Sequence, residues 1–356
     1  MPDWTKSMQQ TYEYYIVDPD SWKDIRMITT VQSCSISRDS TSETLGSASF
    51  TIDESLGEVY VRVYLVTIQN GIRERFPLGT YLVQTNSPSF NGMATSMSCT
   101  AYSPLIELKD AMPPIGYSCL KNDNVLDCAY NFAKDYCRAP VAKAPSTKKF
   151  FSDFVADPSE NSLSYLRNLL SYVDYNLQLD ELGQLMFSPS QELDALQPVW
   201  EFKDDENSIL QSTISMTNDI YGIPNVVEVV YSNGDDYYHT RVVNDDPNSP
   251  VSTVNRGREI IYRETSPSLV GNSTGPQIQE YAEILLNNLS TLSCTISYTH
   301  GYCPVRVGDC VRIHCGAIST DPIKAQVTSQ SINCEPGCTV SETAAYTVKL
   351  WKGKTI

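Results

Sequence analysis

Two adjacent carboxylates, Asp180 and Glu181, lie in the segment DELGQLMFSPS and are the first residues whose types could do chemistry. A carboxylate pair can act as general acid and general base when both side chains face one substrate. Apolar residues alternate with polar ones on both sides of the pair, which predicts two antiparallel strands over 175–188. Gly183 can adopt the positive φ that a tight turn requires. We therefore predict that Asp180 to Gly183 form a hairpin tip and that neither carboxylate is catalytic.

A possible serine nucleophile occurs further along the chain. Residues 271–275 match the pattern G-x-S-x-G around Ser273, with His300 and His314 downstream and Asp309 between them. A nucleophile elbow requires a buried strand before it and a parallel α/β sheet around it. The preceding residues, SPSLV, make a poor buried strand, and alternating β and α units are missing. We interpret the motif as a loop before a helix, and keep a serine esterase using Ser273 as a lesser alternative.

The cysteines form the third constellation. The chain has eleven, and six of them gather in its last quarter: Cys294, Cys303, Cys310, Cys315, Cys334 and Cys338. A metal or iron–sulfur cluster needs about four convergent thiolates, and the close C-x2-C pairs typical of such sites are absent. The odd count favours mostly reduced, buried thiols. We expect no cofactor, and leave disulfides, or an iron–sulfur or zinc site, open as alternatives at these six residues.

The charge balance bears on the class of partner. With 26 basic and 42 acidic residues, the net charge is −16, which argues against a basic surface for binding nucleic acid. No apolar run approaches the ~20 residues of a membrane span. The N-terminal residues lack the pattern of a signal peptide. We therefore expect synthesis in a cytoplasm and no membrane insertion.

Strand patterns occupy both ends of the chain. Residues 58–68 alternate strictly, Asn70 and Gly71 supply a hairpin turn, and a second strand follows. Near the other end, Gly308 and Asp309 mark a turn between two further strands. These patterns predict β structure over roughly 1–105 and again from 200 onward.

Between these two β sections, the apolar residues recur every three or four positions, which is the spacing of an amphipathic helix. One helix is predicted over 123–136 with Asp123 as its cap. Another is predicted over 158–173, with Asp157 as cap and Pro158 in the first helical position. A third helix should begin near Pro276. The residues thus predict a mainly β fold with an α+β insertion.

The order of these segments resembles the baseplate hub, or tail-tip hub, proteins of tailed bacteriophages and related contractile injection systems. The resemblance covers most of the chain and lies in the succession of several segments: TLGSASFTI, FPLGTYLV, NLQLDELGQLMFSPS, IPNVVEVVYSNGDD, NDDPNSPVST, IQEYAEILLNNL and PVRVGDCVRI. The abundance of cysteines departs from what we expect of the family.

The resemblance implies two tube-like antiparallel β-barrel domains with peripheral α+β domains. Residues 1–105 would form the first tube-like domain, and 200–262 with 291–356 the second. Residues 106–199 would form the α+β domain and 263–290 a helical insertion. Three protomers would then make a pseudo-sixfold ring that adapts a sixfold tail tube to a threefold spike and forms part of the DNA channel.

Partners and location follow from the same resemblance. The expected partners are two further copies in a homotrimer, a tail tube or distal tail protein, a central spike or tip protein, and baseplate wedge proteins. DNA would pass without specific binding, in keeping with the negative charge. The location would be the baseplate or tail tip of a virion. The chain ends just past its last predicted strand, so we expect no fused cell-wall hydrolase and no enzymatic activity. A disulfide-stabilised surface or host-recognition protein is the main alternative.

Overall fold

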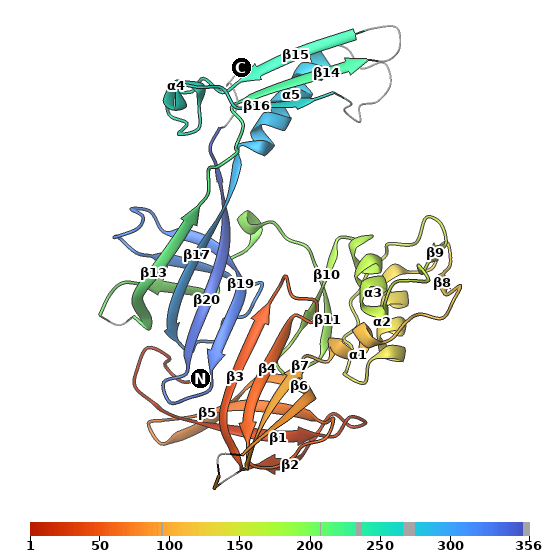
Figure 1. The fold of residues 1–356 in the computed structure, drawn as a ribbon, viewed down its shortest axis with the longest axis vertical. Helices are drawn as coiled ribbons and strands as arrows, with labels where there is room; N and C mark the ends of the chain where they lie inside the picture. The colour runs from red at the N-terminus through yellow and green to blue at the C-terminus, as the bar shows by residue number, and fades with distance from the viewer. Residues whose placement is uncertain (91, 94, 207, 233–236, 266–274, 352–356) are drawn as a thin grey trace. The chain divides into compact units, whose positions relative to one another are not determined.

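The computed structural model describes residues 1–356 except 91, 94, 207, 233–236, 266–274 and 352–356 (Figure 1). Most of the described elements are strands, so the prediction of a mainly β fold is confirmed. Contacts within the chain divide it into two compact units. The first comprises Met1–Ile214 with Ser297–Ala344, and the second Ser215–Ile296 with Ala345–Ile356.

Seven N-terminal strands, red to orange in Figure 1, form an antiparallel sheet in the order β3-β4-β7-β6-β5-β1-β2. Their bounds are β1 Gln9–Val17, β2 Asp24–Ile28, β3 Val31–Asp39, β4 Gly46–Ile52, β5 Tyr60–Gln69, β6 Ile72–Phe90 and β7 Thr95–Tyr102. Alternate residues of β4, among them Phe50 and Ile52, are buried, as expected for a sheet with one face on the core. Asn70 and Gly71 connect β5 to β6 with φ values of 51° and 78°.

The C-terminal strands continue the same sheet through the antiparallel pairing of β19 with β3. These strands are β12 Trp200–Lys203, β13 Leu210–Asn218, β17 Thr291–Gly301, β18 Cys310–His314, β19 Ile323–Asn333 and β20 Thr339–Lys349. Across the described strands the main path is open and ends at β2 and β13. No closed barrel is therefore present among these strands where two were expected, because β3 pairs with β19 instead of closing its own section.

The α+β section has its own core. Its elements are α1 Leu105–Asp110, β8 Ser118–Cys119, α2 Val125–Tyr136, β9 Phe154–Val155, α3 Ser162–Ser171, β10 Tyr175–Leu179, β11 Leu185–Pro189 and the 3₁₀ turn η1 Leu193–Ala195. Side chains from the helices and the β10–β11 hairpin pack together, including Phe132, Tyr165 and Phe187. This core fixes the hairpin against the helices.

Both long helices of this section begin later than their sequence signals predict. The cap of α2 is Asn124, whose side chain accepts from the amides of Leu126 and Asp127, instead of Asp123. The cap of α3 is Asn161. The carboxylate of Asp157 instead accepts from the Ser159 amide in a turn before α3. An Asx turn and a helix cap use the same hydrogen-bond chemistry, which is why the sequence did not separate them.

The second unit is built around a three-stranded sheet in the order β15-β14-β16. Its strands are β14 Val226–Ser232, β15 Tyr237–Val243 and β16 Ile261–Glu264, and its helices are α4 Thr253–Arg256 and α5 Gly275–Leu289. Ile278, Ala282 and Leu286 of α5 pack on Val227 and Val229 of β14. Strands β14 and β15, expected in the second β domain, thus share a core with the helix of the predicted insertion. No helix in the described part of the chain is long and apolar enough to span a membrane.

Candidate functional site

The tip of the β10–β11 hairpin is a turn, and the Asp180 carboxylate is part of it. Oδ1 of Asp180 accepts from the Gln184 amide at 2.7 Å, and the Asp180 carbonyl accepts from the Gly183 amide at 3.0 Å. Gly183 has a φ of 82°. The Asp180 side chain therefore closes the turn and does not point to a substrate.

The second carboxylate joins three sections of the chain. The Glu181 side chain is only 12% exposed. Its Oε2 lies 2.7 Å from Nη2 of Arg306, in the loop before β18, and its Oε1 lies 3.9 Å from Nη1 of Arg38 on β3. Arg38 also donates to Oε1 of Gln330 on β19 and to the Leu78 carbonyl on β6. Glu181 thus links the α+β section to both β sections of the first unit.

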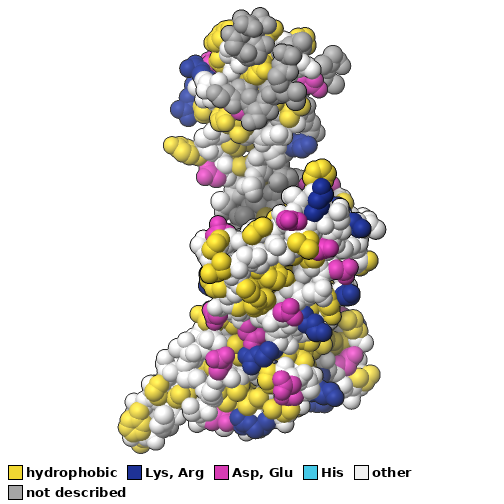
Figure 2. Space-filling view, turned by 90° about the vertical axis from the view of Figure 1, so that its right-hand side faces the viewer, with side chains coloured by type: hydrophobic (Ala, Val, Ile, Leu, Met, Phe, Trp, Pro, Cys, Tyr) yellow, Lys and Arg dark blue, Asp and Glu magenta, His cyan; other side chains and the backbone are white. Residues whose placement is uncertain are grey.

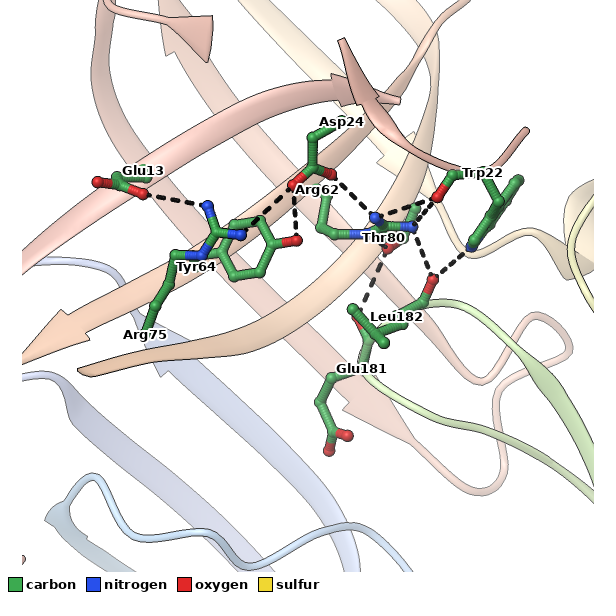
Figure 3. A network of polar contacts seen from close by, with 9 residues as sticks. All are labelled: Glu13, Trp22, Asp24, Arg62, Tyr64, Arg75, Thr80, Glu181 and Leu182. Atoms are coloured by element: carbon green, nitrogen blue, oxygen red, sulfur yellow. Dashed lines mark hydrogen bonds and ion pairs between the residues drawn. The ribbon is translucent and has the colours of Figure 1, made fainter. Parts of the chain in front are cut away.

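The backbone of the tip is held on its other side by the N-terminal sheet, as Figure 3 shows. The carbonyl of Leu182 accepts from Nε1 of Trp22 at 2.7 Å and from Nη2 of Arg62 at 3.1 Å. The Glu181 carbonyl lies 3.5 Å from the Thr80 hydroxyl, which can donate to it. Arg62 is 4% exposed, so its bond to Leu182 is largely shielded from water. A charge-assisted bond of this kind is stronger than a neutral one.

The polar network continues from Arg62 across the sheet (Figure 3). Nη1 of Arg62 lies 2.9 Å from Oδ1 of Asp24, and the hydroxyl of Tyr64 donates to the other carboxylate oxygen at 2.8 Å. Arg75 lies 3.7 Å from Asp24 and 3.5 Å from Glu13. The hairpin tip is therefore attached to a network whose members come from several strands.

Two glycines permit the close approach of these elements. A Cβ on Gly183 would lie 3.0 Å from Cβ of Thr80 and 3.0 Å from the Trp22 ring. Gly308, with a φ of 96°, turns the chain between Arg306 and β18, and Oδ2 of Asp309 accepts from the Arg306 amide at 2.9 Å. Burial raises the pKa of Asp309. This turn places the Arg306 guanidinium against Glu181.

A cavity of about 600 Å³ lies beside the docked tip. Its lining combines three arginines with apolar side chains, including Arg38, Arg167, Arg306, Leu170, Tyr175 and Met186. Two of the arginines are paired with Glu181, and the third donates to the carbonyls of Ser42 and Glu43. The geometry therefore supports docking of the hairpin, not acid–base catalysis by the 180–181 pair.

A second polar cluster is buried beneath β17 and β20. Nδ1 of His300 lies 2.6 Å from the Gly301 carbonyl, and Nε2 lies 3.3 Å from Oε2 of Glu342. Burial opposes the charge of Glu342, but His300, with Tyr298 and Gln330, holds the pKa of this carboxyl below its usual range.

The cluster resembles a cysteine–histidine–carboxylate triad, because Sγ of Cys303 lies 3.8 Å from Nδ1 of His300. Cys303 and Glu342 are each 2% exposed and His300 is 0% exposed. Burial also raises the pKa of the Cys303 thiol, which disfavours the reactive thiolate. The three residues form a buried polar cluster without access for a substrate. In the sequence of β17, apolar residues such as Ile296 and Tyr298 alternate with polar ones, and His300 continues the apolar positions. This alternation could have predicted that His300 faces inward.

The six C-terminal cysteines do not converge. All eleven cysteines of the chain are free thiols, and of the six only Cys315 is more than slightly exposed. Among the described residues no group of three or more His, Cys, Asp or Glu side chains could hold a metal ion. Ser273 and most of its motif lie outside the described residues. His314, on β18, is described, but its position relative to Ser273 is not.

No protein-family model matches the chain, and no curated protein matches it in sequence. Solved structures do match. A tail protein from Neisseria meningitidis MC58 has a TM-score of 0.61 at 14% identity, over 94% of this chain and 97% of that one. The 43 kDa tail protein of prophage MuSo2 from Shewanella oneidensis has a TM-score of 0.60 at 12% identity, over 96% and 98%. A chain of the Francisella PdpA–VgrG complex has a TM-score of 0.60 at 8% identity, over 99% and 60%.

The chain therefore has the fold of phage tail proteins. The similarity to the two tail proteins extends over nearly the whole of both chains, so it covers the α+β section as well as the sheet. The resemblance to tail-tip hub proteins that the sequence indicated is confirmed at the level of the fold.

Proposed function

We propose that this chain is a structural protein of a phage tail tip, where it forms a homotrimeric hub. In this role it adapts a sixfold tail tube to a threefold spike and contributes to the channel through which DNA passes. Its location would be the tail baseplate or tail tip of a virion. It would act through binding surfaces, without a catalytic step.

The observation that carries this proposal is the end-to-end fold similarity to tail proteins. The match covers at least 94% of this chain and at least 97% of each tail protein, so the similarity is not confined to one section of the fold. Because a fold alone does not define a function, the assembly has to be tested directly.

The arrangement of the first unit supports the proposal. The strand path ends at β2 and β13, whose outer edges are unpaired among the described strands. Such edges invite pairing with other chains, and a ring of copies would cover them. The docked hairpin tip ties the α+β section to both β sections, which suits an adaptor that has to transmit force between its partners.

The charge supports a channel for DNA. The net charge is −16, and on the face drawn in Figure 2 basic and acidic side chains are interspersed. Like charge along a channel lets DNA slide without sticking. Replacing exposed lumen carboxylates by lysine in an assembled tail should slow DNA ejection, and unchanged ejection would count against this role.

Light scattering of the purified chain tests the oligomer first. One protomer is 39.7 kDa, so a hub should have about three times this mass and appear as a ring by electron microscopy. The measurement should be made with the chain alone and with a tail tube and spike protein from the same genome. A strict monomer with every partner offered would refute the hub.

A further inference from the structure

Two cysteines that are 300 positions apart in the sequence face each other where β3 pairs with β19. The amide of Cys334 donates to the carbonyl of Cys34 at 3.0 Å. This bond continues the antiparallel register in which Asn333 faces Ser35. Residues paired in this way have Cα atoms about 5.5 Å apart, and their side chains lie on the same face of the sheet.

The side chains are also buried. Cys34 is 2% exposed and Cys334 is 6% exposed. The neighbouring Cys34 thiol, together with burial, raises the pKa of the Cys334 thiol. A disulfide requires Cα atoms within about 4.4–6.8 Å, and the paired backbone meets this requirement.

We propose that Cys34 and Cys334 are a disulfide-forming pair that an oxidant of the peroxide class converts from two thiols to one cross-link. This chemistry does not rest on the proposed function, and a monomer should undergo it as well. It differs from the sequence-based expectation, which considered Cys334 only with the C-terminal cysteines.

The reaction balances with hydrogen peroxide as the oxidant. One thiolate attacks a peroxide oxygen, the O–O bond breaks, hydroxide leaves, and the sulfur becomes a sulfenic acid. The second thiol then attacks this sulfur, the S–O bond breaks, and the S–S bond forms. The two thiols lose two electrons and two protons in total, and the peroxide becomes two water molecules.

Access to the pair would come from the loop that follows β19. Glu335, Pro336 and Gly337 are exposed, whereas Cys334 and Cys338 on either side of them are buried. Local opening of an exposed loop costs less than global unfolding. Because Cys334 lies one residue beyond the end of β19, opening this loop would uncover its thiol.

Cys338 is the competing partner for Cys334. Its φ is 38°, and its amide donates to the Glu335 carbonyl at 2.8 Å, so the loop turns sharply there. The Cys338 thiol interacts with the hydroxyl of Tyr12 on β1, whereas the backbone of Cys334 is paired with that of Cys34. The structure therefore favours Cys34 over Cys338 as the partner of Cys334.

The consequence would be a cross-link at the junction of the two β sections. β19 and β3 are the strands through which the N-terminal and C-terminal parts of the sheet join. A bond there closes a very long loop, which restricts the unfolded chain strongly. The oxidised protein should resist thermal unfolding more than the reduced one.

The test is to expose the full chain to hydrogen peroxide, alkylate the remaining thiols and digest it without reduction for mass spectrometry. We expect a linked peptide containing Cys34 and Cys334, and two fewer alkylated thiols than the eleven of the reduced chain. The cross-link should form faster as the pH rises, because the thiolate is the nucleophile. The melting temperature should increase by several degrees and return to its original value with dithiothreitol.

Substitutions provide the matched controls. C34S and C334S should each abolish the linked peptide, whereas C338S should leave it intact. Met93 is 97% exposed, so its conversion to the sulfoxide reports that the oxidant has acted even if no cross-link forms. A link between Cys334 and Cys338, or eleven free thiols in a chain with oxidised Met93, would overturn the proposal.

Discussion

Glu181 and Arg306 form an ion pair of 2.7 Å between the tip of the β10–β11 hairpin and the loop before β18, 125 residues further along the chain. Arg38 approaches the same carboxylate from β3. A single side chain thus holds two arginines from different β sections. This relationship makes the hairpin tip a structural clamp.

Substitution of Glu181 by Gln should destabilise the first unit. The change keeps the shape of the side chain but leaves the largely buried Arg38 without its carboxylate, which we expect to cost about 2–3 kcal/mol of the free energy of unfolding. Urea denaturation of the purified chain measures this quantity. The control is Glu58→Gln, because Glu58 is 63% exposed and lies 3.9 Å from Arg138, so its loss should cost under about 0.5 kcal/mol. Equal effects of the two substitutions would contradict the clamp.

Gly183 offers a separate test of the close approach of the tip to the sheet. Gly183→Ala adds a Cβ 3.0 Å from both Thr80 and Trp22 at a φ of 82°. Gly116 has a φ of 81°, and a Cβ added there would meet no atom within 4 Å, so Gly116→Ala imposes the backbone strain alone. We expect about 1 kcal/mol for Gly116→Ala and about 1–3 kcal/mol more for Gly183→Ala. Indistinguishable denaturation midpoints would show that the tip is not closely packed.

The hairpin itself could be predicted because its signals are local. Leu177 and Leu185 alternate with polar neighbours, and Gly183 supplies the turn, all within a few residues of one another. The surface that receives the tip could not be predicted. Trp22 and Arg306 lie far from the tip in sequence, and nothing in the pattern of either segment specifies that contact. The type of element was therefore accessible from sequence, and its docking site was not.

The pairing of β19 with β3 shows the same limit. The alternating residues around Ile36 and around Ile332 each predict a strand. Alternation alone does not indicate which strand will pair with which. The expectation of two barrels arose from the resemblance, and the described strands form one open path instead. The predicted first residue of α3 was wrong for a different reason. Asp157 and Asn161 have the same capping chemistry, so the sequence alone does not decide which of them caps the helix.

The His300–Glu342 pair should make stability depend on acid pH. The folded pKa of Glu342 lies below the ordinary value of 4.5, so the unfolded chain binds this proton more readily than the folded chain does. The contribution of the Glu342 carboxylate to the free energy of unfolding is therefore complete above pH 4.5. It is lost as the pH falls through the pKa of Glu342 in the folded chain. Melting temperatures between pH 7 and pH 3 should fall less for Glu342→Gln, which starts from a lower value, than for the original chain.

The exposed carboxylate Glu192 provides the control for this pH profile. Glu192→Gln removes the same charge from a solvent-exposed position, so its melting profile should follow that of the original chain. The buried pair would not carry the effect in either of two cases. In the first, the melting temperature of Glu192→Gln falls less between pH 7 and pH 3 than that of the original chain. In the second, the melting temperature of Glu342→Gln falls as much as that of the original chain.

The edge strand β2 should contribute to assembly if the chain forms a ring. Ile25 is 65% exposed and lies in the bulge of β2, the strand at one end of the sheet path. Ile25→Lys should weaken trimer formation, because a charge on an edge strand opposes pairing and apolar burial. Ile72 is 64% exposed but lies at the β5–β6 turn, so Ile72→Lys is a matched control. Light scattering across a concentration series should show a weakened trimer for Ile25→Lys and an unchanged one for Ile72→Lys. If the two variants assemble alike, the β2 edge is not part of the interface.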